Sequence, residues 1–290
     1  MKPAVFSYRR VDTPEEAVAA LVELGEDAKL IAGGQSLVPM MNFRLARPEA
    51  LVDISRLDQL RYVRPDGDGG LCIGALTLHR DLERLSGPLG DGCSILPQAA
   101  RHIGHYTIRA AGTFGGSLAH ADPASEWCMV ALLLDAEITL LGPAGERTVA
   151  AADFFKGFLE TDLGADEMIV EVRLRCPELA SIQEVCRRQG DFAVVAAAVA
   201  LRTGDGRCTD ARVVLGGVAG SALRIRAAEA ALVGERFSEG SFQAAAAVAA
   251  TDISPPADLN GPPEYRRHLV RVLVRRALAE AAGHRSDPAS

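Results

Sequence analysis

The spacing of apolar residues near the N-terminus predicts a helix over residues 13–24. Apolar side chains in PEEAVAALVEL recur every three or four residues, which places them on one face of a helix. Thr13 is suited to cap this helix, Pro14 to occupy its first position, and Glu16 to complete a capping box with Thr13. Gly25 is suited to end it.

Beyond this helix, short apolar runs that predict strands alternate with helical segments. The predicted strands lie at 29–32, 51–54, 71–75, 137–141 and 167–174, and the predicted helices lie near 94–102 and 124–134. Such a mixture indicates an α+β fold. Proline cannot donate a hydrogen bond to a strand ladder, so we expect a domain boundary between Cys176 and Pro177.

The C-terminal part begins with strands and ends with helices. The runs FAVVAAAVALR (192–202) and ARVVLGGVA (211–219) predict two or three antiparallel strands, because a turn rich in Gly and Asp, TGDGR, joins them. The last helix is predicted at about 263–282. It is amphipathic, with leucine, valine and alanine on one face and arginines largely elsewhere.

Length and composition indicate a globular chain. It has 290 residues, of which 48% are hydrophobic, so we expect two domains, or one domain with an appended lobe, and a sizeable core. The formal net charge of −7 offers no basic face of the kind that nucleic-acid binding requires. No apolar run approaches the ~18 residues of a membrane span, and the N-terminus has no apolar signal segment. We therefore expect a cytoplasmic chain without a transmembrane segment.

The six cysteines lie far apart in the sequence. Iron–sulfur and zinc sites usually take thiolates from closely spaced pairs, so we interpret these cysteines as buried, reduced thiols and expect no cluster in this chain. His102, His105 and His120, with Cys128 nearby, suggest zinc at first sight. The H-x₂-H spacing does not place both rings on one helical face, however, and no metal site is predicted.

Two glycine-rich loops contain the candidate chemistry. The first, Ala32-Gly33-Gly34-Gln35-Ser36, follows a predicted buried strand. Adjacent glycines allow successive backbone N–H groups to converge on an anion such as a pyrophosphate, and Gln35 and Ser36 add side-chain donors. A lone pair of glycines is nevertheless more often a plain turn.

The second loop has the same chemistry and lies within TIRAAGTFGGSLAHADPASEW (107–127). Its glycine and hydroxyl residues are Gly112, Thr113, Gly115, Gly116 and Ser117. Asp122 follows, where a carboxylate can accept hydrogen bonds from ribityl or ribose hydroxyls. An Asp before a Pro is more commonly a turn residue or a helix N-cap. Two such loops together are a stronger indication than either alone.

Common nucleotide-binding and hydrolase patterns are missing. The chain has no G-x-x-x-x-G-K-[ST] sequence, which excludes a Walker-type phosphate loop. It also has no G-x-G-x-x-G that opens a βαβ unit, which removes the usual route to NAD binding. The absence of a G-x-S-x-G elbow disfavours a hydrolase. A dinucleotide cofactor would therefore be held in another way.

These segments resemble the FAD-binding medium subunits of the molybdenum hydroxylases, the family of the medium subunit of aerobic carbon monoxide dehydrogenase and the flavin domain of xanthine dehydrogenase. The resemblance rests first on AGGQSLVPMMNFR and TIRAAGTFGGSLAHADPASEW. It extends over the whole chain, because RRQGDFAVVAAAVAL is similar to the family's R-x-x-D-[aromatic]-A strand, VVLGGVA to its glycine-bearing strand and PEYRRHLVRVLVRRAL to its closing helix.

The resemblance implies an α+β fold. A flavin-binding domain of the PCMH type would cover residues 1–176, in two subdomains of about 1–56 and 57–176. A C-terminal flavoprotein domain would follow at 177–290, with a three-stranded antiparallel sheet packed with helices. FAD would lie between the domains.

The resemblance also implies roles for individual residues. Residues 32–36 and 113–117 would hold the FAD pyrophosphate, and Asp122 would lie near the ribityl or ribose hydroxyls. Phe192 matches an aromatic position that lies against the isoalloxazine in relatives, although the sequence by itself favours an ordinary core residue of a strand. Arg188 is a weaker candidate for a charge near the ring.

A heteromeric enzyme is the further implication. The molybdopterin–molybdenum cofactor and the [2Fe–2S] clusters would belong to a large and a small partner subunit, in a dimer of heterotrimers. FAD in this chain would pass electrons from those clusters to an external acceptor, so no catalytic side chain is predicted. Gln35 stands where the carbon monoxide dehydrogenase type typically has His, which makes the resemblance one to the wider family. The cysteine-bearing insert of relatives with an extra cluster is absent.

Two other functions compete with this one. A self-contained FAD-dependent oxidase or reductase would need a substrate pocket with a placed acid or base and a covering domain, for which the alanine-rich C-terminal part is small. A scaffold that has lost its cofactor is disfavoured by the intact glycine loops.

Overall fold

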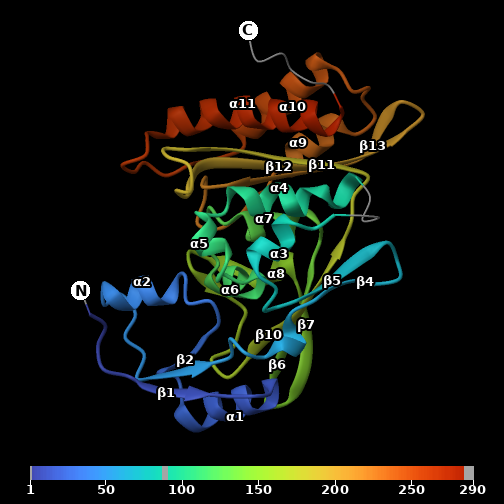
Figure 1. Ribbon diagram of the computed structural model, residues 1–290. Helices are drawn as coiled ribbons and strands as arrows, with labels where there is room; N and C mark the ends of the chain where they lie inside the picture. The colour runs from blue at the N-terminus through green and yellow to red at the C-terminus, as the bar shows by residue number, and fades with distance from the viewer. Residues whose placement is uncertain (1, 87–90, 284–290) are drawn as a thin grey trace.

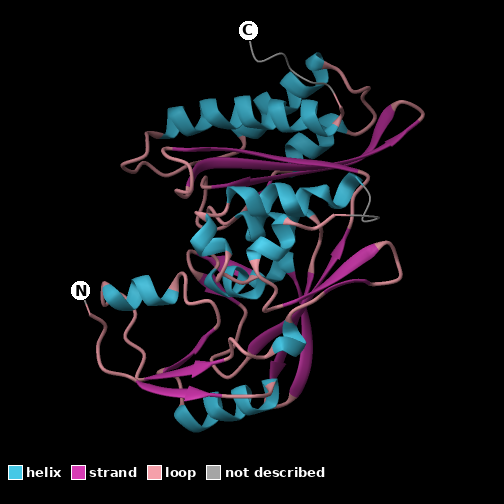
Figure 2. Cartoon of the chain, viewed as in Figure 1, coloured by secondary structure: helices cyan, strands magenta, loops and turns pink. Residues whose placement is uncertain are grey.

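The computed structural model describes residues 2–86 and 91–283. The described part of the chain is elongated (Figure 1). A small N-terminal sheet with α1 and α2 lies at one end, a body of helices and strands lies in the centre, and the C-terminal sheet with its helices lies at the other end. Figure 2 shows the same succession as alternating zones of helix and strand.

The N-terminal subdomain is built on a parallel sheet in the order β1-β3-β2. Its strands are β1 (Ser7–Arg10), β2 (Ala28–Ile31) and β3 (Ala50–Asp53). Helix α1 (Pro14–Leu24) joins β1 to β2, and the short helix α2 (Leu37–Asn42) follows the first glycine loop. The strands predicted at 29–32 and 51–54 are confirmed to within one residue.

The predicted cap of α1 is confirmed in part. The Thr13 hydroxyl accepts a hydrogen bond from the Glu16 N–H at 3.1 Å, and Gly25 ends the helix with a φ of 78°. The Glu16 carboxylate, however, accepts from the N–H of Asp12 at 2.9 Å rather than from that of Thr13. The reciprocal bond of the capping box is therefore displaced by one residue.

The central body contains an antiparallel sheet in the order β4-β5-β10-β6-β7. Its strands are β4 (Val63–Pro65), β5 (Gly70–Gly74), β6 (Glu137–Gly142), β7 (Gly145–Ala150) and β10 (Met168–Arg175). The α-helices of this body are α3 (His79–Glu83), α4 (Ile95–His102), α5 (Tyr106–Arg109), α6 (Phe114–His120), α7 (Glu126–Leu133) and α8 (Ala151–Phe154). Two short 3₁₀ helices, η1 (Asp58–Leu60) and η2 (Asp91–Ser94), and a small hairpin of β8 (Phe155–Gly157) and β9 (Glu160–Thr161) complete it.

The C-terminal sheet is antiparallel, with three long strands: β11 (Leu179–Cys186), β12 (Ala193–Gly204) and β13 (Arg207–Gly216). The prediction of three strands is thus confirmed for these, and β14 (Leu223–Arg224) adds a fourth strand of two residues. So short a strand has no alternating pattern that a sequence could reveal. Helices α9 (Arg226–Leu232), α10 (Glu239–Thr251) and α11 (Pro263–Ala281) pack on the sheet.

The predicted turn between β12 and β13 is a two-residue turn. Asp205 and Gly206 both have positive φ, 52° and 71°, and Gly204 pairs directly with Arg207. This backbone suits the right-handed twist of a hairpin, which explains why Asp-Gly occupies it.

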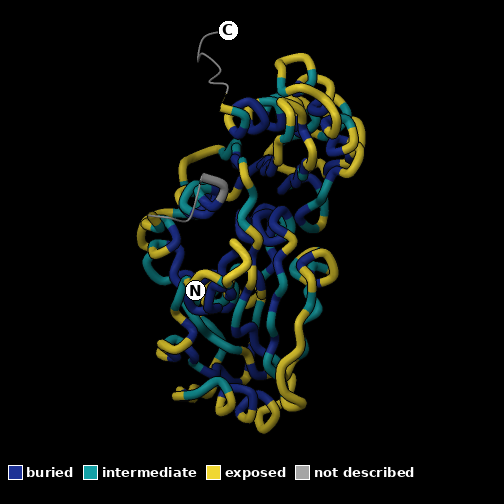
Figure 3. Tube along the Cα trace, turned by 90° about the vertical axis from the view of Figure 1, so that its right-hand side faces the viewer, coloured by how far each residue is buried: buried dark blue, intermediate teal, exposed yellow. Residues whose placement is uncertain are grey.

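Strand β12 is buried on both faces, which explains its unbroken apolar run. Ala196, Ala198 and Ala200 belong to the central core together with Trp127, whereas the alternating residues Val195, Ala197, Val199 and Leu201 belong to the core under α9, α10 and α11. Figure 3 shows buried segments through the middle of the molecule and exposed ones mainly along its edges and ends. The central core thus includes residues from both sides of Pro177. The proposed domain boundary there stays a prediction, and residues 284–290 of the predicted C-terminal domain lie outside the described part.

One expectation about the cysteines is wrong. The structure joins Cys93 in η2 to Cys176 at the end of the central sheet by a disulfide, with the Cα atoms 5.1 Å apart. The two are 83 residues apart in the sequence, so local spacing did not indicate the pair. Cys72, Cys128 and Cys208 are buried free thiols as predicted, and Cys186 is free but partly exposed. None of the helices in the described ranges combines the length and apolar character needed to cross a bilayer.

Candidate functional site

A cavity of about 570 Å³ lies between the N-terminal subdomain and the central body. Its walls come from β2 and the loop before α2, from α6 and the loop before it, from the start of α7, and from the segments before β10 and β12. The volume lies within the ~300–1,000 Å³ of typical cofactor and small-molecule sites. The cavity brings together the two glycine loops that the sequence separates.

All but one of the predicted site residues line this cavity. They are Ala32, Gly33, Gly34, Gln35, Ser36, Gly112, Thr113, Gly115, Gly116, Ser117, Asp122 and Phe192. Arg188 does not line the cavity. It is exposed and lies two residues beyond the end of β11. Its role as a charge near the ring stays a prediction.

The glycines serve partly a different purpose from the predicted one. A Cβ atom on Gly33 would lie 2.0 Å from the carbonyl oxygen of Ala111, and one on Gly115 would lie 2.7 Å from the Cβ of Ala75. Both distances are too short for any side chain. These glycines therefore allow the loops to pack against each other and against the end of β5, which shapes the cavity before any ligand enters.

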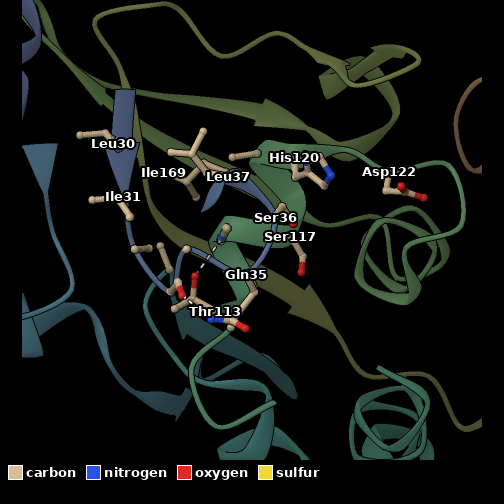
Figure 4. Close-up of a pocket in the computed structure, with 18 of the residues that line it drawn as sticks. Leu30, Ile31, Gln35, Ser36, Leu37, Thr113, Ser117, His120, Asp122 and Ile169 are labelled. Atoms are coloured by element: carbon tan, nitrogen blue, oxygen red, sulfur yellow. Dashed lines mark hydrogen bonds between the residues drawn. The ribbon is translucent and has the colours of Figure 1, made fainter. Parts of the chain in front are cut away.

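The backbone of the first loop offers a group of hydrogen-bond donors. The Gln35 side-chain amide donates to the carbonyl oxygen of Gly33 at 2.7 Å and closes the loop on itself, and Gly34 has a φ of 67° (Figure 4). Within residues 2–86 and 91–283, the N–H groups of residues 33–37 donate to no protein acceptor. Consecutive free N–H groups at a glycine turn are a suitable site for an anionic group such as a pyrophosphate.

The second loop is fixed by the start of α6. The buried Thr113 hydroxyl accepts from the Gly116 N–H at 3.1 Å, so this hydroxyl caps the helix. Gly116 is exposed and Ser117 is partly exposed, so these two residues are the open part of the loop. Ser117 and Ser36 both line the cavity (Figure 4).

Asp122 and Phe192 lie at the end of the cavity nearer to the C-terminal sheet. Oδ1 of Asp122 accepts from the Ala124 N–H at 2.8 Å, which makes Asp122 a turn residue, one of the two roles considered for it. Its Oδ2 accepts from none of the described residues. The Phe192 ring is not in the core: the residue is 66% exposed and borders both this cavity and a second one of about 560 Å³.

Two buried titratable residues of the cavity wall were not predicted. His79 is 3% exposed and its Nδ1 accepts from the Trp127 indole N–H at 2.9 Å. Burial lowers the pKa of His79 to about 4, with a smaller contribution from the nearby Arg109 charge, so the ring is neutral at pH 7. Glu126 is 7% exposed, and burial, reinforced by the Glu184 carboxylate, raises its pKa to about 8. In the sequence, an acidic residue directly before the apolar run WCMVALLL could have indicated Glu126. No sequence pattern indicated His79.

Lys29 is the one residue with a fixed positive charge among the described residues that line the cavity. The negative charge of a phosphate-bearing ligand would therefore be stabilised mainly by backbone N–H groups rather than by ion pairs.

Comparisons with known families agree with this geometry. Residues 4–177 match the model of the FAD binding domain in molybdopterin dehydrogenase, and residues 180–281 match the CO dehydrogenase flavoprotein C-terminal domain. The chain belongs to this family. The FAD-binding domain contains both glycine loops, and the flavoprotein C-terminal domain contains β12 and the long helix α11.

Individual members of the family match along almost their whole length. The 6-hydroxypseudooxynicotine dehydrogenase complex subunit alpha of Paenarthrobacter nicotinovorans is 40% identical over 99% of this chain and 98% of its own. The carbon monoxide dehydrogenase medium chain of Hydrogenophaga pseudoflava is 37% identical over 97% of this chain and 98% of its own.

Solved structures show the same fold. A chain of carbon monoxide dehydrogenase from Hydrogenophaga pseudoflava superposes with a TM-score of 0.93 at 38% identity, covering 99% of this chain and all of that one. A chain of quinoline 2-oxidoreductase from Pseudomonas putida 86 gives 0.92 at 36% identity, covering 98% and 99%. The α+β fold with an FAD-binding domain and a C-terminal sheet is thereby confirmed. The protein is an FAD-binding subunit of the molybdenum oxidoreductase type.

Proposed function

We propose that the chain is the flavoprotein subunit of a heteromeric molybdenum hydroxylase or dehydrogenase. It would pass electrons from the [2Fe–2S] clusters of a small partner subunit through FAD to an external acceptor, while a large partner subunit oxidises the substrate at molybdenum. The observation that carries the proposal is one cavity lined by both glycine loops, in a chain that matches medium subunits from end to end. We expect a dimer of such heterotrimers in the cytoplasm.

The residues of the cavity fit the parts of FAD. The free N–H groups of residues 33–37 and the open residues Gly116 and Ser117 would hold the pyrophosphate. The unpaired Oδ2 of Asp122 would accept from a sugar or ribityl hydroxyl. The exposed ring of Phe192 provides a flat apolar surface for the isoalloxazine. Bound FAD supplies chemistry at both the one- and two-electron levels, and the chain positions it.

The substrate is expected to be a property of the partner subunits. Relatives of similar identity have names that point to unlike substrates: a 6-hydroxypseudooxynicotine dehydrogenase at 40%, a carbon monoxide dehydrogenase at 37% and a glyceraldehyde dehydrogenase at 34%. The Gln35 side chain closes its own loop through the Gly33 carbonyl oxygen, a local structural role that indicates no substrate.

Isolation of the chain tests this function in two steps. The purified chain should retain FAD, seen as flavin absorbance and as free FAD released on denaturation. A chain that neither retains FAD nor binds it when it is added would contradict the proposal. Coexpression with its candidate partners should then yield a complex with an iron–sulfur chain and a larger molybdenum chain.

The same preparations separate the rival function. A self-contained FAD oxidase or reductase would turn over a substrate as a solitary chain. The proposed subunit should instead accept electrons from dithionite and pass them to a dye or quinone, yet oxidise no organic substrate until the partners are present.

A further inference from the structure

Arg266 is a buried arginine near the start of α11. The residue is only 3% exposed although it is charged. Its Nη1 donates to the carbonyl oxygens of Val194 and Gly217, at 2.5 Å each, and its Nη2 donates to Oδ2 of Asp258 at 2.7 Å. One side chain thus joins the start of β12, the turn after β13 and the loop before α11.

The Val194 carbonyl belongs to an irregular point of the C-terminal sheet. The register between β11 and β12 shifts between Val185 and Cys186, so Val194 is an extra residue of β12 that opposes no residue of β11. Such a bulge interrupts the ladder and redirects the strand. Arg266 therefore binds the backbone where the sheet alone fixes it least.

Phe192 lies directly before β12, two residues from Val194. It lines the flavin cavity, and at 66% exposure its ring has little packing of its own, so its position depends on the backbone beside it. On the N-terminal side, Gly190 packs on the His105 ring, which a Cβ atom on Gly190 would approach to 2.6 Å. Arg266 supports the backbone on the other side, through Val194.

The turn at Gly217 joins this arrangement to the central body. Gly217 has a φ of 74°, and a Cβ atom on it would lie 2.6 Å from the Val194 carbonyl oxygen, the same oxygen that Arg266 binds. The Gly217 N–H donates to the carbonyl oxygen of Pro123, in the loop before α7, at 3.0 Å. These contacts fix the backbone beside Phe192 relative to the central body.

Packing alone does not account for an arginine at this position. Nε of Arg266 is buried with no hydrogen-bond partner among the described residues, and the side chain of its ion-pair partner Asp258 is 45% exposed. Apolar side chains can often replace a buried ion pair without loss of stability. The distinctive contribution of the guanidinium is directional, because it donates to carbonyl groups of two different segments.

We propose that Arg266 is a positioning residue of the flavin site, which holds the backbone beside Phe192 so that the ring is in place to receive the isoalloxazine. The inference rests on the proposed function, because it requires FAD in the cavity with its ring system at Phe192. Arg266 does not line the flavin cavity, so it acts through Val194 and Gly217 rather than by contact. Groups that are already in place lose less conformational freedom on binding, and this raises affinity.

A double-mutant cycle tests this role by titrating the flavin-free full chain with FAD. Phe192→Ala should raise the Kd roughly fivefold, and Arg266→Met, which removes the donors, should raise it by up to that factor. The double variant should bind FAD about as well as Phe192→Ala alone, because a misplaced ring and a missing ring lose the same contact. Arg271→Met, which changes an exposed arginine on the same helix, is the control and should leave the Kd unchanged.

Gly217→Ala disturbs the same contacts without removing the guanidinium. Its methyl group would meet the Val194 carbonyl oxygen, so FAD affinity should fall, and it should fall no further when Phe192→Ala is already present. Gly234→Ala is the matched control, because Gly234 has a similar φ of 88° but no described atom lies within 4 Å of the new Cβ. It should leave FAD affinity unchanged. This pair decides the question if Arg266→Met does not fold.

ADP separates positioning from general damage, because it has the pyrophosphate but no isoalloxazine. Its affinity, measured by competition with FAD, should be the same in Arg266→Met as in the wild type. Equal losses for ADP and FAD, additive losses in the cycle, or an unchanged Kd for FAD would overturn the positioning role while the proposed function stands. A wild-type chain that binds no FAD would instead contradict the proposed function.

Discussion

Gly33 and Ala111 lie so close that a Cβ atom on Gly33 would be 2.0 Å from the Ala111 carbonyl oxygen. They belong to the two different glycine loops. The contact means that the loops form one unit, and that the position of the first loop's free N–H groups depends on the backbone of the second. The glycine pair thus has a packing role that a sequence motif does not reveal.

Substitution of Gly33 should separate the loops. Gly33→Ala forces a methyl group into backbone that cannot move without displacing α6, so we expect a loss of roughly 1–3 kcal/mol of unfolding free energy and a larger loss of FAD binding. The FAD-to-protein ratio after purification and denaturant unfolding measure the two effects. Gly240→Ala in the first turn of α10, where the nearest atom is 3.9 Å from the new Cβ, is the control and should be neutral. Normal FAD content in Gly33→Ala would contradict the argument.

The Phe192 ring should contribute to flavin affinity without contributing to the fold. Phe192→Ala removes a ring that is already 66% exposed, so the stability of the chain without FAD should hardly change. Loss of an aromatic contact to the isoalloxazine should weaken FAD binding by about 1 kcal/mol, roughly fivefold in Kd, and raise the flavin's fluorescence. Titration of the flavin-free chain with FAD measures this.

Phe158→Ala is the matched control for Phe192. Phe158 is also an exposed phenylalanine, at 69%, but it lines the second cavity and not the flavin cavity. Its removal should leave flavin affinity and fluorescence unchanged. Equal losses for both variants would show that Phe192 acts through general surface packing rather than through the flavin.

The sequence predicted those features that depend on local chemistry. The cap and the glycine stop of α1, the Asp-Gly turn after β12 and the two glycine loops all follow from residues close together in the chain, and the structure shows each of them. The features that it missed depend on contacts over long separations. Glu184 meets His102 across 82 residues, Cys93 meets Cys176 across 83, and Trp127 donates to His79 across 48. The exposure of Phe192 likewise follows from the cavity around it and not from its strand-like neighbours.

The buried His79 should make the fold less stable at acid pH. Its pKa is about 4 in the folded chain, against 6.5 for an ordinary histidine, so between these values the unfolded chain binds more protons. This depressed histidine pKa therefore lowers stability as pH falls from 6.5 to 4, by about 3 kcal/mol in total. In His79→Gln, which keeps an acceptor for Trp127, the unfolding free energy should depend less on pH in this window.

A second histidine variant controls for the substitution. His268→Gln changes an exposed residue on α11. At every pH it should alter the unfolding free energy less than His79→Gln does. A wild-type and a His79→Gln chain whose denaturation midpoints fall in parallel between pH 6.5 and 4 would show that His79 is not the residue responsible.

Glu126 should have the opposite effect on stability in the alkaline direction. Its pKa is about 8 in the folded chain, against 4.5 for an ordinary glutamate. The folded chain therefore binds more protons between these values, and stability falls as pH rises through them. Glu126→Gln removes this loss, and the variant should gain on the wild type by on the order of a few kcal/mol at pH 8, with the difference fading towards pH 4.5. Glu15→Gln, an exposed residue in the first turn of α1, should show no comparable gain. A Gln variant that is less stable than the wild type at pH 8 would mean that the carboxylate is stabilised in the folded chain, and that the cavity wall holds a charge rather than a proton.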